Sequence, residues 1–465
     1  MTRAVQNIEI ALIALASSAI LLLDAPTNEL HGTAVFYASL IREMVTNGWL
    51  SIFEGERAYF LKPPLVLWLS AGSAEILGLT NLGVSLVSRL AAILCVLLSY
   101  LITRKLFDHR VAALATLVLI TNSTFIQFSA TLRMDSMLLC GGLLSILAWL
   151  HREKPWASPA IFLGITIGVL SKGPLGLAPV ILLALHAWWF GISLKDQIKW
   201  RWAVLLVPIV AWYGYLFLLH GAAPFTQLGA DLAKPAATGA NQGLIDTYQE
   251  YILKPARRYL PWLPFMLVGA YGAIRISFSG NFQEKATMRW LLIWFVIVFV
   301  AAATKPDKDI RYLYMGLPVL AMFAGLSLAK IQQRFQLKWL TTSIAALVIS
   351  VALIFNYGPP APADTRPVIN AMRAEVNAEQ QPLIAIGGYP IAAKQPRRQN
   401  THRDWIHFYL GLEPTVLAWS QITPRDMLSG ETYFLTNNRS HESRLAEYDL
   451  TAKYKSIEMV YAIRR

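Results

Sequence analysis

The sequence has little charge and little cysteine. Only 15% of its 465 residues are charged, whereas a soluble globular protein carries about a quarter. Its two cysteines, Cys95 and Cys140, both fall inside apolar runs, so we expect neither a disulfide framework nor a cysteine-based metal site. Low-complexity and collagen-like classes are also excluded. Apolar residues make up 55% of the chain, and its 15 Trp, 18 Tyr and 20 Phe suit a membrane–water boundary. The composition therefore indicates a membrane protein.

Eleven apolar runs approach the roughly 20 residues that a helix needs to cross a bilayer. They predict an α-helical polytopic membrane protein with spans near 8–23, 86–103, 111–129, 134–150, 157–171, 174–192, 202–220, 261–279, 288–303, 313–329 and 339–356. No small-residue cleavage site follows the first run, so we expect a retained helix, although an uncleaved signal anchor would look the same.

Lysine and arginine predict the orientation, because short cytoplasmic loops carry the excess of basic residues. With the N-terminus in the cytoplasm, five basic residues fall in short outer loops, namely Arg133, Lys172, Lys305, Lys308 and Arg311. Fourteen fall on the inner side: Arg104, Lys105, Arg110, Arg152, Lys154, Lys195, Lys199, Arg201, Arg275, Lys285, Arg289, Lys330, Arg334 and Lys338. Because topology accounts for most of the net charge of +13, we expect no nucleic-acid partner. The predicted location is the cell inner (plasma) membrane.

The membrane domain is predicted to cover residues 1–357, with two long outer loops at 24–85 and 221–260. Within the first loop, the apolar segment 64–79 is too short to span comfortably and contains Glu75. If it crossed the bilayer, every later loop would change sides and the basic bias would reverse. We therefore predict an interfacial or re-entrant helix on the outer face.

A Gly- and Pro-rich linker at 358–362 precedes a change in composition. Residues 358–465 mix short apolar runs with charges, which is typical of a small α/β domain. The segments "PLIAIGG" and "ETYFLTNN" predict strands, whereas "PVINAMRAEVNA" and "SHESRLAEYDL" predict helices. The orientation of the spans places this domain outside the cytoplasm, in the periplasm or extracellular space.

Basic side chains recur at the outer ends of the predicted spans, where the positive-inside rule does not favour them. Such groups make sense if they bind an anion anchored in the membrane, for example a lipid phosphate. The alternative is contact with lipid headgroups or salt bridges with Asp135, Asp307 and Asp309. The residues concerned are Lys62, Arg133, Lys172, Lys305, Lys308 and Arg311, the last followed by Tyr312.

Two acids, Asp24 and Glu29, follow the first span in "LLLDAPTNELHG". Transfer of a sugar from a lipid phosphate needs a carboxylate that takes the proton of the attacking hydroxyl, because the phosphate already provides the leaving group. Both acids are candidates for that base, although Asp24 could merely end the helix in a turn. The neighbouring charges Glu43, Glu54, Glu56 and Arg57 are read first as a solvated face.

The segment "SLIREMVTNGWLSIFEGERAYFLKPPLVLWL" resembles the first outer loop of the bacterial lipid-A aminoarabinose transferases. Their wider relatives include the protein O-mannosyltransferase-like enzymes of the GT-C membrane fold. Further resemblances follow in order in "TLRMDSMLL", "GVLSKGPLGLAP" and "KPDKDIRYLYMGLPVLAMFAG", so that the likeness covers about residues 8–330. It implies a GT-C fold of about 11 transmembrane helices. It also implies inverting transfer of a sugar from a polyprenyl-phosphate donor to lipid A, a protein hydroxyl or another surface acceptor, at the outer face of the inner membrane.

The resemblance also implies roles for single residues. Lys62 matches the family lysine of "K-P-P" that holds the donor phosphate, and Arg311 and Tyr312 match the "R-Y" that closes over the same site. Asp135 matches a functionally important acid, so the catalytic candidates are Glu29, Asp24 and Asp135. The full predicted phosphate-binding set is Lys62, Arg311, Tyr312, Arg133, Lys172, Lys305 and Arg57.

Two positions depart from the family pattern. The family has an Asp-Glu pair in its first outer loop, and an insertion is needed to bring Asn28-Glu29 into register with it. Leu61 stands where the lipid-A enzymes have a metal-binding glutamate, and loop 221–260 lacks their partner histidine. A leucine side chain offers no donor atom to a metal. We therefore predict no zinc site and no cofactor, and leave open a divalent cation elsewhere.

The leading hypothesis is a pentosyl- or hexosyltransferase acting on lipid A or a related glycolipid in lipopolysaccharide biosynthesis. The alternatives are a protein O-glycosyltransferase of the same fold, a transporter or flippase of lipid-linked sugars, and a non-catalytic scaffold. A transporter should show internal repeats, and none is evident. In the last domain, "KQPRRQNTHRDWIHFYLG" could contact an acidic glycolipid, but a solvated surface with Trp405 and Phe408 in its core is preferred.

Overall fold

The computed structural model describes residues 3–22, 30, 33–50, 52–54, 57–232, 247–305, 308–335, 383–387, 401–411, 415–418, 433–436, 450–455 and 460–464. The chain forms two compact units. The first comprises Met1–Ala25, Tyr59–Val66 and Ser85–Pro360, and the second comprises Pro26–Ala58, Leu67–Val84 and Ala361–Arg465. The predicted span 339–356 lies outside the described residues, and the predicted domain boundary at 357 stays a prediction.

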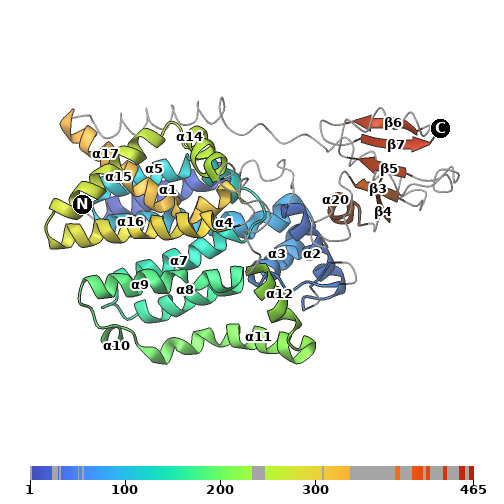
Figure 1. Ribbon diagram of the computed structural model, residues 1–465, viewed down its shortest axis with the longest axis horizontal. Helices are drawn as coiled ribbons and strands as arrows, with labels where there is room; N and C mark the ends of the chain where they lie inside the picture. The colour runs from blue at the N-terminus through green and yellow to red at the C-terminus, as the bar shows by residue number, and fades with distance from the viewer. Residues whose placement is uncertain are drawn as a thin grey trace. The chain divides into compact units, whose positions relative to one another are not determined.

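The first unit is built from apolar helices (Figure 1). Its core includes Trp149, Trp290, Phe125 and Phe323, all at most 1% exposed. In chain order the elements are α1 (Arg3–Leu22), α4 (Asn81–Leu106), α5 (His109–Ile120), α6 (Ser123–Ser129), α7 (Asp135–Leu150), α8 (Ala157–Lys172), η1 (Gly173–Leu177), α9 (Ala178–Trp189), α10 (Leu194–Gln197), η2 (Trp200–Leu206), α11 (Val207–His220), α12 (Ala223–Leu232), η3 (Gln249–Leu253), α14 (Lys254–Arg258), α15 (Leu263–Ser279), α16 (Phe282–Ala303), η4 (Ile310–Gly316) and α17 (Leu317–Arg334). The start of α4, up to Val84, belongs to the second unit.

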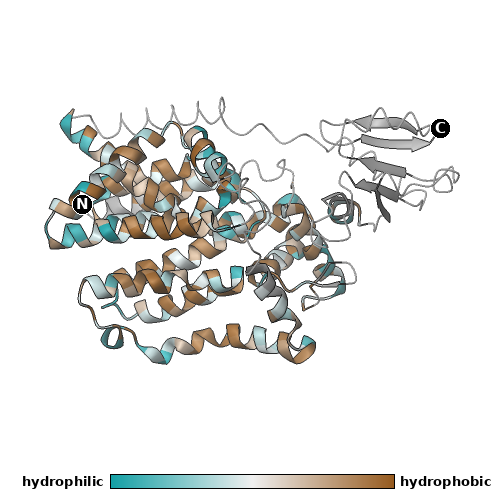
Figure 2. Ribbon diagram, in the orientation of Figure 1, coloured by the Kyte–Doolittle hydropathy of each residue, from teal (hydrophilic) through white to brown (hydrophobic). Residues whose placement is uncertain are grey.

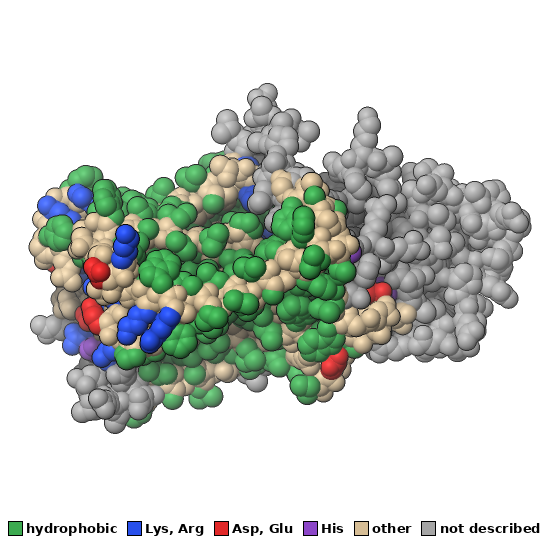
Figure 3. All heavy atoms as spheres, turned by 90° about the horizontal axis from the view of Figure 1, so that it is seen from below, with side chains coloured by type: hydrophobic (Ala, Val, Ile, Leu, Met, Phe, Trp, Pro, Cys, Tyr) green, Lys and Arg blue, Asp and Glu red, His purple; other side chains and the backbone are tan. Residues whose placement is uncertain are grey.

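The surface of these helices is apolar. Along α11, Leu218 is 83% exposed and Val210 is 70% exposed. Figure 2 shows hydrophobic residues along α9, α11 and α16, and Figure 3 shows a face covered by hydrophobic side chains with Lys and Arg gathered at one end. Among the described residues five helices are long and apolar enough to span, or six if the bent pair α5 and α6 counts as one. Such a surface belongs in a bilayer, so the helical membrane fold is confirmed.

Helices α8 and α9 are two arms of a hairpin, although together they have the length and composition of a single span. A Cβ added to Gly168 would lie 3.0 Å from the Cα of Gly176, whereas in one continuous helix eight residues rise by about 12 Å. The chain therefore reverses at η1, and the two separate spans predicted at 157–171 and 174–192 stay a prediction. The reversal needs a glycine, because a Cβ on Gly176 would lie 2.1 Å from the Val169 nitrogen.

The second unit contains α2 (Thr33–Asn47), a short hairpin of β1 (Phe53–Glu54) and β2 (Arg57–Ala58), and α3 (Leu65–Leu77). Helix α3 occupies the segment predicted as an interfacial helix and is 13 residues long. Its Glu75 Oε1 accepts the indole N–H of Trp49 at 2.8 Å, and Trp68 Nε1 donates to the Trp49 carbonyl at 2.9 Å. These bonds tie α3 to the turn that follows α2.

A five-stranded sheet completes the second unit, in the order β4-β3-β5-β7-β6. β3 is parallel to β4 and β5, whereas β7 is antiparallel to β5 and β6. Parallel neighbours need a crossover connection, and α20 (Thr401–Leu410) lies in the connection between β3 and β4. The two predicted strands are present as β3 and β5. The two predicted helices lie outside the described residues, except that the last residue of the second, Leu450, begins β6. The strands are β3 (Leu383–Gly387), β4 (Thr415–Ala418), β5 (Tyr433–Thr436), β6 (Leu450–Lys455) and β7 (Val460–Arg464).

Candidate functional site

A buried ion pair joins the adjacent ends of two neighbouring helices. Asp135 is the first residue of α7 and is 6% exposed, and Lys172 is the last residue of α8. The Lys172 ammonium donates to the Asp135 carboxylate. An acid at a helix N-terminus and a base at a C-terminus each suit the helix dipole. The pair is therefore placed by the helix ends as well as by mutual attraction.

Two arginines add positive charge around this pair. Arg133 and Arg311 both act electrostatically on the Asp135 carboxylate, together with Lys172. Arg133 lies in the turn between α6 and α7, where its backbone N–H donates to Ser88 Oγ at 3.1 Å and its guanidinium lies 5.1 Å from the centre of the Phe128 ring. With Asp135 and with Asp309, the partner of Arg311, these three cations leave a net charge of +1, which attracts an anion.

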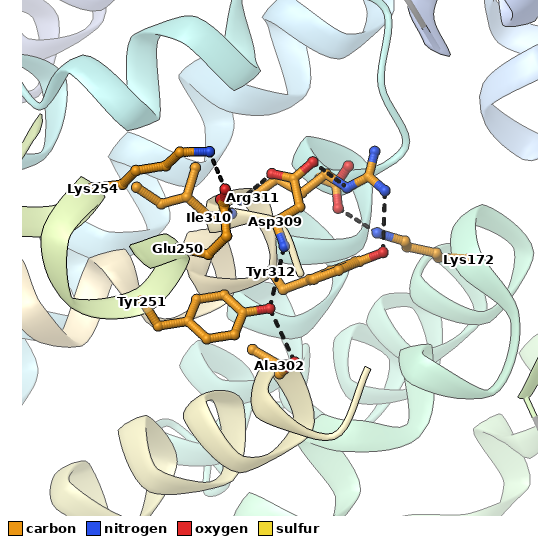
Figure 4. Close-up of polar contacts among 10 residues, drawn as sticks. Lys172, Glu250, Tyr251, Lys254, Ala302, Asp309, Ile310, Arg311 and Tyr312 are labelled. Atoms are coloured by element: carbon orange, nitrogen blue, oxygen red, sulfur yellow. Dashed lines mark hydrogen bonds and ion pairs between the residues drawn. The ribbon is translucent and has the colours of Figure 1, made fainter. Parts of the chain in front are cut away.

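Arg311 and Tyr312 approach the pair from η4 (Figure 4). Arg311 Nη2 donates to the Tyr312 hydroxyl at 3.1 Å, and Arg311 Nε lies 3.3 Å from Asp309 Oδ2. Asp309 is also the N-cap of η4, since its Oδ1 accepts the Arg311 N–H at 2.9 Å. Figure 4 shows Lys172, Arg311 and the hydroxyl end of Tyr312 converging. These contacts fix the direction of the guanidinium.

The loop before η4 is held by the π-helical turn η3. Glu250 Oε2 accepts the Ile310 N–H at 3.1 Å, and Lys254 pairs with the same carboxylate. Tyr251 donates its hydroxyl to the Ala302 carbonyl at 3.0 Å and accepts the Asp309 N–H at 3.4 Å. Two side chains of η3 therefore fix the backbone that carries Arg311.

A second set of bonds holds η4 against α6 and α7. The Tyr314 hydroxyl lies 2.8 Å from Ser129 Oγ and 3.2 Å from Ser136 Oγ. Its ring stacks on Phe125 with the ring centres 5.4 Å apart. Tyr314 is fully buried, so these bonds lie away from water and specify a single arrangement.

The segment that contains Lys62 lies next to the α8–η1 junction. A Cβ on Gly173, the neighbour of Lys172, would lie 4.0 Å from Pro63 Cγ and 3.7 Å from the Tyr213 hydroxyl. Lys62 is half-buried. The structure therefore brings the Lys62 segment close to the helix end that carries Lys172.

The remaining predicted site residues are less well described. Asp24 and Glu29 lie outside the described residues, and Arg57 is described by its backbone in β2 but not by its side chain. Lys305 follows α16, is half-buried, and donates its backbone N–H to the Ala302 carbonyl at 3.1 Å. The roles of all of these residues stay predictions.

The expectation that this chain has no zinc site at position 61 stays a prediction. Leu61 offers no ligand atom, whereas a catalytic zinc needs about three protein ligands. His220, at the end of α11, stacks on Phe60 with the ring centres 4.7 Å apart, so one imidazole does lie near this segment. Across the described part of the chain, no cluster of three or more His, Cys, Asp or Glu residues could hold a metal.

Sequence reasoning missed several residues that support the site. Glu250 and Tyr251 carry no motif signal, because their partners are backbone groups about 60 and 50 residues away. Arg89 was also missed, although it is 1% exposed. Its guanidinium donates to the Leu21 carbonyl and to Ser85 Oγ, which ties the end of α1 to α4. The sequence did offer two signals: Arg89 is a lone arginine inside an apolar run, and His220 stands just before loop 221–260.

The fold and this cluster define a polytopic helical membrane protein with a cationic site at one set of helix ends. Residues 61–214 match the family model described as dolichyl-phosphate-mannose-protein mannosyltransferase. The undecaprenyl phosphate-α-4-amino-4-deoxy-L-arabinose arabinosyl transferase of Shewanella sediminis is 27% identical over 317 residues, which are 62% of this chain and 53% of that protein. A second such transferase, from Pseudomonas fluorescens, is 26% identical over 63% of this chain and 51% of its own length. The chain thus spans about half the length of these relatives.

Solved structures show the same fold. The crystal structure of ArnT from Cupriavidus metallidurans bound to undecaprenyl phosphate matches with a TM-score of 0.70 and 15% identity, over 99% of this chain and 98% of that one. The Archaeoglobus fulgidus oligosaccharyltransferase matches with a TM-score of 0.55 and 14% identity, over 96% of this chain and 68% of that one. The chain is thus similar in sequence to these aminoarabinose transferases and shares its fold with the solved ArnT structure, in line with the resemblance found in its sequence.

Proposed function

We propose that this protein is a GT-C glycosyltransferase that moves a monosaccharide from a polyprenyl-phosphate sugar to lipid A or a related glycolipid. The observation that carries the proposal is the cationic cluster of Lys172, Arg133 and Arg311 around Asp135. Such a cluster suits a phosphate. The similar transferases are named for an undecaprenyl-phosphate donor, and the ArnT structure holds undecaprenyl phosphate.

The proposed topology has eleven spans, a cytoplasmic N-terminus and an extracytoplasmic C-terminal α/β domain. It is supported by the excess of basic residues in the loops assigned to the inner side. The cluster residues all belong to loops assigned to the outer side, so the reaction would take place at the outer face of the inner membrane.

The chemistry follows from the leaving group. The acceptor hydroxyl attacks the anomeric carbon, the bond between that carbon and the phosphate oxygen breaks, and the polyprenyl phosphate departs with inversion at the sugar. Lys62, Lys172 and Arg311 would neutralise the departing phosphate. Glu29 or Asp24 would take the hydroxyl proton.

Asp135 is better suited to orient Lys172 than to act as the base. Its carboxylate is already bound to that ammonium and surrounded by two arginines. Asp135 would therefore fix the direction of Lys172 toward the donor phosphate.

We also propose that transfer needs no zinc ion bound near position 61, because the basic side chains alone can neutralise the donor phosphate. Treating the purified protein with a chelator should leave its activity unchanged. Loss of activity on chelation, restored by one divalent cation, would place a metal elsewhere in the site.

The function is tested by mass spectrometry of lipid A and other surface glycolipids from cells with and without the gene. The deletion should remove a sugar-sized mass, and a gene carrying Glu29→Gln should fail to restore it. If Glu29→Gln restores the mass and Asp24→Asn does not, Asp24 is the base. An unchanged lipid profile in the deletion strain would contradict a glycolipid acceptor and direct the search to protein acceptors or to lipid-linked sugar transport.

A further inference from the structure

Helix α20 docks on α2 within the second unit, although the two are far apart in the sequence. Arg42 Nε, on α2, donates to the Phe408 carbonyl at 2.9 Å in the last turn of α20. A cation on the last carbonyls of a helix suits its dipole. Gly411 ends α20 with φ +72°, and a Cβ there would lie 2.9 Å from Arg42 Nη1. The end of α20 is therefore shaped to fit α2.

A histidine adds a second connection between the two helices. His407 Nδ1 lies 2.7 Å from Ser39 Oγ, and His407 Nε2 lies 3.3 Å from Glu43 Oε2. His407 and Phe408 are both buried. This part of the basic-aromatic stretch is thus occupied by packing inside the chain, in line with the preferred sequence interpretation of Phe408 as a core residue.

The next residue of α20 reaches a different target. The Tyr409 hydroxyl donates to Asn81 Oδ1 at 2.7 Å and accepts the backbone N–H of Leu30 at 3.2 Å. Leu30 is 2% exposed, so its N–H would be costly to leave without a partner. Tyr409 is separated from Leu30 by 379 positions along the chain. Asn81 fixes the direction of the hydroxyl, so that its lone pair faces the Leu30 amide.

Leu30 directly follows Glu29, the first candidate for the base. We propose that Tyr409 is a positioning residue for transfer, which holds the backbone beside Glu29 through the Leu30 amide. This inference rests on the proposed function. It gives the C-terminal part of the chain a role in the chemical step, because small displacements of a catalytic group lower the rate steeply.

The test compares Tyr409→Phe with wild type, using the full-length protein in nanodiscs. Phenylalanine keeps the ring and removes the hydroxyl. Hydrogen–deuterium exchange by mass spectrometry would follow a peptide that covers residue 30, and transfer kinetics would give kcat and the KM for the donor. We expect faster exchange at residue 30. We also expect kcat to fall about three- to tenfold, the size of one lost hydrogen bond, with the donor KM unchanged.

Two further variants make the result specific. Asn81→Ala should show the same pattern to a smaller degree, since it removes the bond from the Tyr409 hydroxyl to Asn81 Oδ1. Tyr271→Phe is the matched control, because Tyr271 is 62% exposed on α15, and neither readout should move in it.

Unchanged exchange at residue 30 in Tyr409→Phe would overturn the anchoring. Faster exchange with unchanged kcat would overturn the positioning role while leaving the proposed function intact. If the wild-type protein transfers no sugar, the proposed function fails and the positioning role fails with it. The exchange data would then still report whether Tyr409 holds Leu30.

Discussion

The surroundings of Arg311 restrict the direction in which its guanidinium can bind a ligand. Its guanidinium contacts the Tyr312 hydroxyl and the Asp309 carboxylate, and its backbone N–H is bound by the same aspartate. Arginine presents donors in a fixed fork, whereas lysine presents a single rotatable ammonium. These contacts fix the orientation of the Arg311 guanidinium, as phosphate recognition requires.

We expect Arg311→Ala to lower kcat/KM for the donor by about 100-fold or more, the usual cost of removing a group that stabilises developing charge. Arg311→Lys should recover part of the loss, because it restores charge without the fork. Arg275→Ala is the matched control, since Arg275 is exposed on α15 at the predicted inner side. Steady-state kinetics of the purified variants would measure this. A fully active Arg311→Ala protein would remove Arg311 from the donor site.

The sequence predicts this cluster only in part. Lys62, Arg133, Lys172 and Arg311 could be found because basic residues at outer helix ends are unusual. Spacing alone could not show that Lys172 binds Asp135, because the contact joins positions 37 apart through the antiparallel packing of α7 and α8. Salt bridging with Asp135 was the structural alternative to anion binding for such a lysine, and the structure shows that this pair is formed. The same lysine can serve both purposes.

At the scale of elements, the α8–η1–α9 hairpin decides where Lys172 lies. The reversal depends on the close approach of Gly176 to the backbone of Val169. The hairpin could be predicted from the sequence because a Gly-Pro step follows Lys172 and interrupts the apolar run. The closeness of its two arms could not be predicted, because it depends on contacts between specific backbone atoms.

Gly176→Ala should open the hairpin and displace Lys172. The added Cβ would require the two arms to separate, and we expect a cost of at least about 2 kcal/mol in stability, as for other overpacked interiors. The melting temperature measured in detergent should fall, and the affinity for the donor should fall with it. Gly214→Ala on α11 is the control, because a Cβ there meets nothing within 4 Å. Equal melting temperatures for Gly176→Ala and wild type would contradict the packing described here.

The turn η3 is the second element on which the site depends, through Glu250 and Tyr251. Tyr251→Phe removes the hydroxyl that joins the Ala302 carbonyl to the Asp309 N–H. We expect the donor KM to rise about three- to tenfold, since the loop that carries Arg311 loses roughly one hydrogen bond. Tyr248→Phe should have no effect, because Tyr248 is 54% exposed. A donor KM that stays at the wild-type value in Tyr251→Phe would show that η3 does not hold the loop.

For the whole molecule, the membrane class, the helical fold and the family resemblance could be predicted from composition, span pattern and motifs, because each depends on residues that are close together in the sequence. The contact of Tyr409 with Leu30 could not be predicted, because tertiary packing brings these distant positions together. The orientation in the membrane stays a prediction. It accounts for why the cluster residues belong to one set of loops and most basic residues to the other.

We propose that the cationic cluster activates a polyprenyl-phosphate sugar for transfer. To test this, the purified protein in nanodiscs would be incubated with a synthetic polyprenyl-phosphate aminoarabinose and lipid A, and both lipids would be followed by mass spectrometry. We expect release of polyprenyl phosphate in equal amount to glycosylated lipid A, and almost none with Lys172→Ala. Equal donor cleavage by wild type and Lys172→Ala would contradict it.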